Sequence, residues 1–85
     1  MIVSFYTSVL KHTNGDKFIE LDDCLNLQDV VDMLGERYGK TFVSLLHSGS
    51  FFIIVNGSGI MSTGGLNTPL NPGDRIEVLP VAEDG

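Results

Sequence analysis

The chain has 85 residues, enough for one small domain with a single core but too few for a deep enclosed pocket. Eleven acidic and five basic side chains give a net charge of −6, which argues against nucleic-acid binding and favours basic protein partners. A single cysteine excludes an internal disulfide and a cysteine-built zinc site, and the longest apolar run, 51–55, is too short to span a bilayer. We therefore expect a cytoplasmic domain with no secretory signal and no contact with nucleic acid or membrane.

The first 21 residues predict a β-hairpin. Residues 2–10 alternate as a strand does, with Val3 and Phe5 on one face and Tyr6 on the other. Asn14-Gly15 is typical of a tight hairpin turn, and residues 17–21 predict the returning strand.

Residues 27–38 predict the main helix. Asn26 is a good N-cap, and Asp29, three positions later, completes a pattern that resembles a capping box. Leu25 and Val30 occupy the two positions of a hydrophobic staple. The apolar stripe at helical spacing consists of Leu27, Val30, Val31, Leu34 and Tyr38.

The second half of the chain predicts two further strands. Gly39 is placed to end the helix in the left-handed conformation, and residues 40–50 predict a connecting turn or short helix that plugs one end of the core. Residues 51–55 form a β-prone strand that Asn56-Gly57 ends, and residues 57–68 predict a loop with at most one short edge strand.

The last strand and the end of the chain follow a turn. Asn71-Pro72-Gly73-Asp74 predicts a type II turn, and residues 75–79 alternate as a strand. Residues 80–85 show no periodicity. We therefore expect a folded domain over 1–79 and a flexible C-terminal tail over 80–85.

This order of elements predicts an α+β fold of the β-grasp, or ubiquitin-like, type. One main helix packs on one face of a mixed sheet of four to five strands, in which the first and last strands pair in parallel at the centre. The other face is open, so its side chains are either polar or part of an interface. We expect Tyr6, Phe52 or Ile54, and Leu79 to bind a partner there.

The sequence offers no good active site and no metal site. His12 and His47 have no second ligand at a metal-binding spacing, and exposed loop positions explain them better. Cys24 has no basic neighbour to lower its pKa and is best explained as a small buried residue. The carboxylate pairs within 22–23 and 29–32 are best explained as solvated groups near a helix start.

Several segments together resemble one known family. They are Val3-x-Phe5-Tyr6, the helix end from Leu34 to Gly39, Val55-Asn56-Gly57, the run from Gly65 through Thr68-Pro69-Leu70 to Asp74, and the run from Ile76 to Ala82. In this order and spacing the chain resembles the MoaD/ThiS family of sulfur carriers, and within it most closely the MoaD branch, the small subunits of molybdopterin synthase.

The resemblance implies a carrier protein rather than an enzyme. The carboxylate of Gly85 would be adenylated by a MoeB/ThiF-like enzyme that uses ATP, converted to a thiocarboxylate, and delivered to a MoaE-like large synthase subunit for molybdenum or tungsten cofactor synthesis. The chain itself would bind no cofactor. Its tail, Pro80, Val81, Ala82, Glu83 and Asp84, would carry Gly85 over as much as ~20 Å at ~3.3 Å per residue.

One residue departs from the family pattern and leaves two alternatives open. The family ends in Gly-Gly, whereas this sequence ends in Asp84-Gly85. The alternatives are a β-grasp protein-binding module without the sulfur chemistry, and a ubiquitin-like modifier that is joined to lysine amines.

Overall fold

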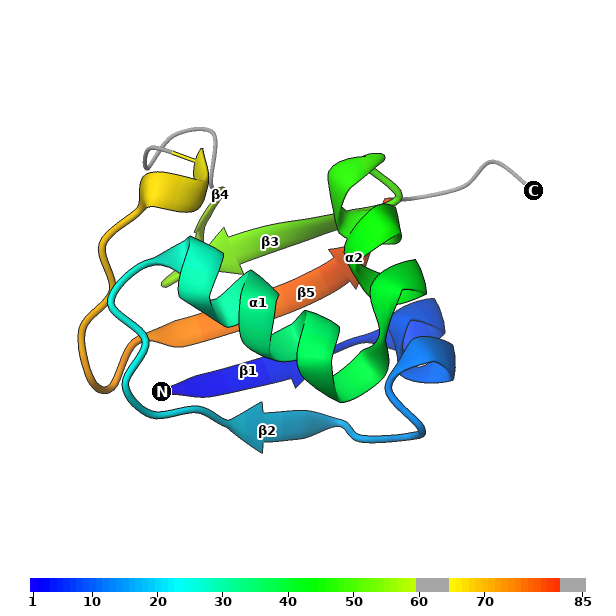
Figure 1. Cartoon of the computed structure of the whole chain (residues 1–85), viewed down its shortest axis with the longest axis horizontal. Helices are drawn as coiled ribbons and strands as arrows, with labels where there is room; N and C mark the ends of the chain where they lie inside the picture. The colour runs from blue at the N-terminus through cyan, green and yellow to red at the C-terminus, as the bar shows by residue number, and fades with distance from the viewer. Residues whose placement is uncertain (60–64, 82–85) are drawn as a thin grey trace.

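A five-stranded mixed sheet carries the helices on one face in the computed structural model, which describes residues 1–59 and 65–81. The strands lie in the order β2-β1-β5-β3-β4, and their bounds are β1 Ile2–Phe5, β2 Phe18–Glu20, β3 Phe51–Val55, β4 Ser58–Gly59 and β5 Arg75–Pro80. β1 and β5 pair in parallel at the centre, and the other neighbouring strands pair antiparallel. Helices α1 (Leu27–Tyr38) and α2 (Lys40–His47) lie across the same face (Figure 1). The predicted α+β, β-grasp architecture is confirmed.

The first strand is shorter than predicted. β1 has four residues, and Thr7–His12 form a 3-10 helix (η1) where the alternation predicted a strand as far as residue 10. Tyr6 is still extended and donates its N–H to the Val78 carbonyl (3.3 Å), but Thr7 takes φ = 49°, which turns the chain out of the ladder. Val9 is fully buried from the 3-10 helix, so its apolar side chain fits either structure.

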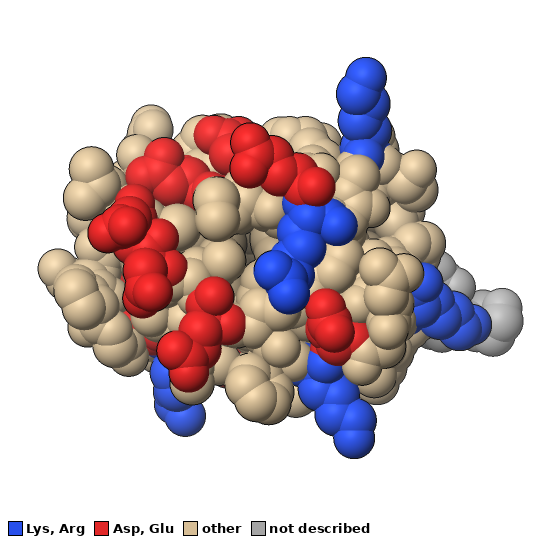
Figure 2. Space-filling view, turned by 60° about the horizontal axis from the view of Figure 1, so that its bottom comes forward, with Lys and Arg blue, Asp and Glu red and all other residues tan. Residues whose placement is uncertain are grey.

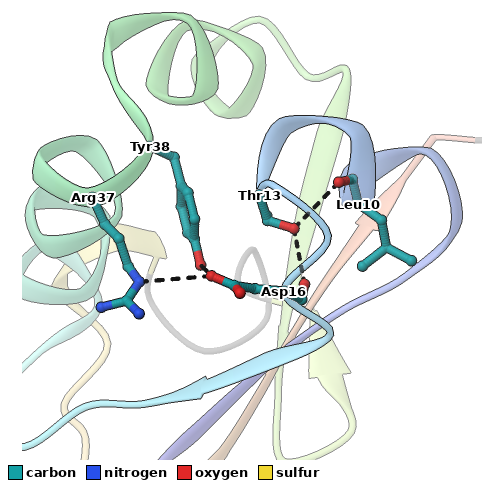
Figure 3. Close-up of polar contacts among 5 residues, drawn as sticks. All are labelled: Leu10, Thr13, Asp16, Arg37 and Tyr38. Atoms are coloured by element: carbon teal, nitrogen blue, oxygen red, sulfur yellow. Dashed lines mark hydrogen bonds and ion pairs between the residues drawn. The ribbon is translucent and has the colours of Figure 1, made fainter.

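The predicted Asn-Gly turn forms, but it joins η1 to β2 instead of closing a tight hairpin. Asn14 and Gly15 both have positive φ, and the buried Thr13 hydroxyl donates to the Asp16 carbonyl (2.8 Å). The Tyr38 hydroxyl donates to the Asp16 carboxylate (2.8 Å), which ties this turn to the end of α1 (Figure 3). A two-residue hairpin does form at Asn56-Gly57, where Val55 on β3 pairs with Ser58 on β4.

At the start of α1 the predicted capping hydrogen bonds form, but the predicted hydrophobic staple does not. The Asn26 side chain accepts the Asp29 N–H (3.0 Å), and the Asp29 carboxylate accepts the Leu25 N–H (2.9 Å). The predicted staple between Leu25 and Val30 is wrong, because the Leu25 side chain is 76% exposed. The Leu25 carbonyl accepts the Leu70 N–H (2.9 Å), and Leu70 is the residue that is buried beside this turn.

The connection after α1 is the short helix that the sequence allowed. Gly39 has φ = 99° between the two helices, a conformation that a residue with a side chain rarely adopts. Phe42 on α2 is buried and packs against the rings of Phe5, Tyr38 and Phe51, with ring centroids 5.4–6.0 Å apart. α2 therefore closes one end of the core, as predicted.

The turn before β5 also forms as predicted. Asp74 donates its N–H to the Asn71 carbonyl (3.1 Å), and Gly73 has the positive φ that a type II turn requires. The Asn71 N–H donates to the Asp74 carboxylate (2.8 Å), and this hydrogen bond lowers the pKa of that carboxyl. The turn therefore fixes the point from which the central strand runs towards the end of the chain.

Candidate functional site

The chain leaves the sheet at the end of β5, its central strand. Pro80 is paired with Phe51 on β3, and Val81 donates its N–H to the Ser50 carbonyl (2.9 Å), one bond beyond the strand. The Val81 side chain is 45% exposed. The rest of the predicted tail lies outside the described residues, namely Ala82, Glu83, Asp84 and Gly85. The last described contact of the tail is therefore the bond between Val81 and Ser50.

The sheet face away from the helices carries the four residues predicted to bind a partner. Phe52, 41% exposed, stands opposite Leu79 in the β3–β5 register, and Ile54 stands opposite Glu77. Both β3 residues face this side, where the sequence required only one of them. Tyr6 is 40% exposed and follows β1 on the same side. We call this surface the tail-end patch: Tyr6, Phe52, Ile54 and Leu79.

Sequence reasoning missed two apolar residues on the same open face. Phe18 on β2 is 61% exposed and pairs with Ser4, and Ile2 at the start of β1 is also exposed. The period-two alternation already contained the signal, because Val3 and its partner Ile19 are buried and their neighbours along each strand must face the other way. The open face is therefore apolar over more of its width than predicted.

A shallow hollow lies in the middle of the open face, between β1 and β5. It has a volume of about 250 Å³ and is lined by Ile2, Ser4, Tyr6, Arg75 and Glu77. The Glu77 carboxylate raises the pKa of the Tyr6 phenol above its usual value, because it accepts a hydrogen bond from the hydroxyl and its charge disfavours the phenolate. Tyr6 thus remains a neutral hydrogen-bond donor at physiological pH.

The candidate reactive side chains do not assemble into a site. No group of three or more His, Cys, Asp and Glu residues suited to a metal ion occurs within 1–59 and 65–81. His12 and His47 are exposed at the ends of η1 and α2, and His12 contacts the Phe51 ring edge-on (5.5 Å between centroids). Cys24 is buried as predicted, and burial raises the pKa of its thiol, which disfavours the nucleophilic thiolate.

Acidic side chains gather around the start of α1 and the loop before it (Figure 2). A hollow of about 360 Å³ there is lined by five carboxylates together with Cys24 and Met33; the carboxylates are Asp22, Asp23, Asp29, Asp32 and Glu36. Because α1 covers the opposite face of the sheet, much of the negative charge lies away from the tail-end patch. The two sides of the molecule therefore differ in chemistry, one acidic and one largely apolar.

Among the described residues, no helix is both long enough and apolar enough to span a bilayer.

Comparison with known proteins gives one family and a set of similar folds. The model of the ThiS family matches residues 3–83, nearly the whole chain. No curated protein sequence matches significantly.

Three solved structures share the fold over almost their full length. The BexX/CysO complex of Amycolatopsis orientalis contains a chain that is 24% identical, with a TM-score of 0.80, covering 99% of this chain and 98% of that chain. CysO of Mycobacterium tuberculosis is 27% identical, with a TM-score of 0.78 and coverage of 95% and 98%. A Pyrococcus furiosus protein described as molybdopterin converting factor, subunit 1, is 19% identical, with a TM-score of 0.71 and coverage of 95% of each chain.

Proposed function

The chain belongs to the ThiS family of ubiquitin-like sulfur carriers, and on this premise we propose that it is a MoaD-like carrier in molybdopterin synthesis. Gly85 supplies the carboxylate that is adenylated and then converted to a thiocarboxylate. In this role the chain is a substrate of other enzymes and not a catalyst itself.

The observation that carries the proposal is the exit of the chain from β5. The central strand is held on both sides, by β1 and by β3, as far as Val78 and by β3 alone up to Pro80, and Val81 is bonded to Ser50. Beyond Val81 the sequence has four residues, which span at most ~13 Å at ~3.3 Å each. A carboxylate at that distance from a rigid body is suited to entering an active site in another protein.

The chemistry needs two steps and two reagents that other molecules supply. A carboxylate oxygen of Gly85 attacks the α-phosphorus of ATP, and pyrophosphate leaves. Sulfur at the oxidation level of sulfide then attacks the acyl carbon, and AMP leaves with the former carboxylate oxygen. A MoeB/ThiF-like adenylating enzyme supplies the first site, and a MoaE-like large synthase subunit takes up the thiocarboxylate sulfur.

Two features support the molybdopterin route. The segment from Thr68 through Leu70 to Asp74, and the Pro80-Val81-Ala82 lead into the tail, resemble the MoaD branch. The Pyrococcus furiosus protein with the same fold carries a molybdopterin-converting description. The BexX/CysO complex supports an enzyme as the partner in general terms.

Intact mass tests the proposal. The chain is incubated with ATP, sulfide and the cognate adenylating enzyme, and we expect a mass gain equal to the exchange of one oxygen for one sulfur. A chain lacking Gly85 is the matched control. Its melting temperature should not change, because glycine has no side chain to bury, and it should show no ATP–pyrophosphate exchange.

Other outcomes point to the two alternatives. Stable complex formation without any change of mass would favour a binding module, and conjugation to a lysine amine would favour a protein modifier. Pyrophosphate exchange by the chain that lacks Gly85 would exclude its carboxylate as the reactive group.

A further inference from the structure

Glu77 holds an unusual place on the open face of the sheet. It lies on the central strand, opposite Ser4 of β1 on one side and Ile54 of β3 on the other. The residue is half-buried before any partner binds. A carboxylate in the middle of a largely apolar surface loses water when that surface is covered, and such a loss is unfavourable unless the partner supplies a compensating group.

The chain itself does not neutralise this charge. Among the residues that the structure describes, Glu77 forms no ion pair with a lysine, arginine or histidine. The Tyr6 hydroxyl, which lines the same hollow, is a neutral group, so the two side chains together still carry a full negative charge. Arg75, two residues earlier on the same side of β5, is exposed at the far end of the hollow.

Glu77 lies close to the point where the tail leaves the sheet. The tail-end patch borders Glu77 through Tyr6 and Ile54, and Leu79 of the patch is two residues from Val81, where the tail begins to leave the sheet. An enzyme that binds the last residues of this chain in its active site approaches this end of the molecule, and contact with the tail-end patch would bring its surface over Glu77.

We propose that Glu77 determines the specificity of this surface, and that the adenylating enzyme inserts an arginine side chain into the hollow beside Glu77 and Tyr6. The inference rests on the proposed function and names the chemistry of the partner of that same tail. A guanidinium group suits the hollow, because its planar fork binds a carboxylate with two hydrogen bonds and its flat face packs on an aromatic ring. Ser4 adds a hydroxyl acceptor at the same place.

Binding of the unmodified chain to the cognate adenylating enzyme, measured by calorimetry without ATP, tests the inference. Glu77→Gln keeps the shape and the contact with Tyr6 but removes the charge. We expect it to weaken binding by about tenfold or more and to reduce the salt dependence of the dissociation constant. Glu36→Gln, on the exposed side of α1, changes the net charge equally and should leave the affinity within about twofold.

The direction in which Glu77→Gln changes the affinity decides whether the inference holds. If the enzyme covers Glu77 without a cation, Glu77→Gln should bind more tightly, because an unpaired buried charge has been removed; that result, or an unchanged affinity, overturns the inference and leaves the carrier function standing. Phe52→Ala should weaken binding in either case and shows that the open face is in contact. If the wild-type chain does not bind the enzyme at all, the carrier proposal fails and this inference fails with it.

Discussion

Tyr6 follows the last residue of β1, and its side chain lies on the open face of the sheet. Its N–H extends the β1–β5 ladder to Val78, and its hydroxyl lies beside Glu77. Because Thr7 then leaves the ladder with a positive φ, Tyr6 is the last residue that β1 can place on this face. The backbone bond therefore determines the face of the sheet on which the Tyr6 side chain lies.

The raised pKa of Tyr6 can be used to test the interaction between Tyr6 and Glu77. Glu77→Gln should lower the pKa of the Tyr6 phenol towards the ordinary value of 10.0, because an amide accepts the same hydrogen bond without a charge that opposes the phenolate. Ultraviolet titration of tyrosinate in a Tyr38→Phe background measures it, because Tyr38 is the one other tyrosine in the sequence. Glu36→Gln should leave the titration unchanged.

The raised pKa of Tyr6 also predicts how the stability of the fold changes with pH. A folded-state pKa above that of the unfolded chain stabilises the fold below about pH 10, and this contribution is lost as the pH rises through the folded-state pKa. An equal alkaline loss of stability in wild type and Glu77→Gln would show that Glu77 does not cause the shift.

Individual residues show what the sequence could and could not predict. The sequence placed Phe52 or Ile54 on the open face, and the structure places both there, because residues two apart on a strand share a face whatever the neighbouring strands are. The staple between Leu25 and Val30 was wrongly predicted: Leu25 is exposed, and the residue buried beside this turn is Leu70, which comes 45 positions later. Local patterns in the sequence predict which face of an element a residue occupies, but they do not predict contacts with residues far away in the sequence.

At the scale of elements, the two helices meet at one close contact. Gly35 of α1 faces Val43 of α2, and a Cβ atom added at Gly35 would lie 2.8 Å from a methyl carbon of Val43. Real Cβ atoms essentially never come so close to another heavy atom. The approach of α2 to α1 therefore depends on glycine at this position.

Gly35→Ala tests this contact. Alanine in a helix interior normally stabilises by ~0.5–1 kcal/mol relative to glycine, but overpacking costs ~1–3 kcal/mol, so we expect a net loss of ~1 kcal/mol in urea unfolding. In a Val43→Ala background the same change should become stabilising by ~0.5–1 kcal/mol, because the methyl group is gone. A stabilising effect of Gly35→Ala in the wild-type background would mean that the helices separate at little cost.

Elements were predictable where their signals were local. The N-cap, the apolar stripe and Gly39 all lie within or next to α1, and they were sufficient to define its bounds. The parallel pairing of β1 with β5 followed from the order of elements and the length of chain between them. The 3-10 helix η1 was missed for two reasons. The buried Val9 is compatible with both a strand and a helix, and the residue with positive φ that ends β1 is Thr7 rather than a glycine, which would have predicted a turn.

At the scale of the whole molecule, charge is distributed unevenly. The five carboxylates that line the hollow beside α1 repel one another, whereas Asp16, near the C-terminal end of α1, lies near Arg37 (3.9 Å) and accepts a hydrogen bond from the Tyr38 hydroxyl. Repulsion among exposed charges destabilises the compact state and is screened by salt over a Debye length of ~10 Å at 0.1 M. Salt should therefore stabilise this domain.

Melting temperature as a function of sodium chloride concentration tests this expectation. Asp23→Asn should raise the melting temperature at low salt, by an amount that corresponds to a few tenths of a kcal/mol, and should flatten the salt dependence. The replacement suits the site, because Asp23 has φ = 64° and asparagine tolerates that conformation. Asp16→Asn is the opposed control and should lower the melting temperature. A melting temperature that falls with salt would show that attractive pairs dominate.

The parallel pairing of the first and last strands also determines how the domain resists force. When a partner draws the tail away, tension enters through Pro80 and acts along β5, whose neighbours hold it by bonds roughly perpendicular to that pull. The bonds from Ile2–Phe5 and from Phe51–Val55 are then loaded together in shear, and they cannot open one after another like a zipper. Mechanical unfolding would therefore require the simultaneous rupture of both ladders, a high barrier on the unfolding side. A domain built in this way resists unravelling when it is pulled by this end of the chain.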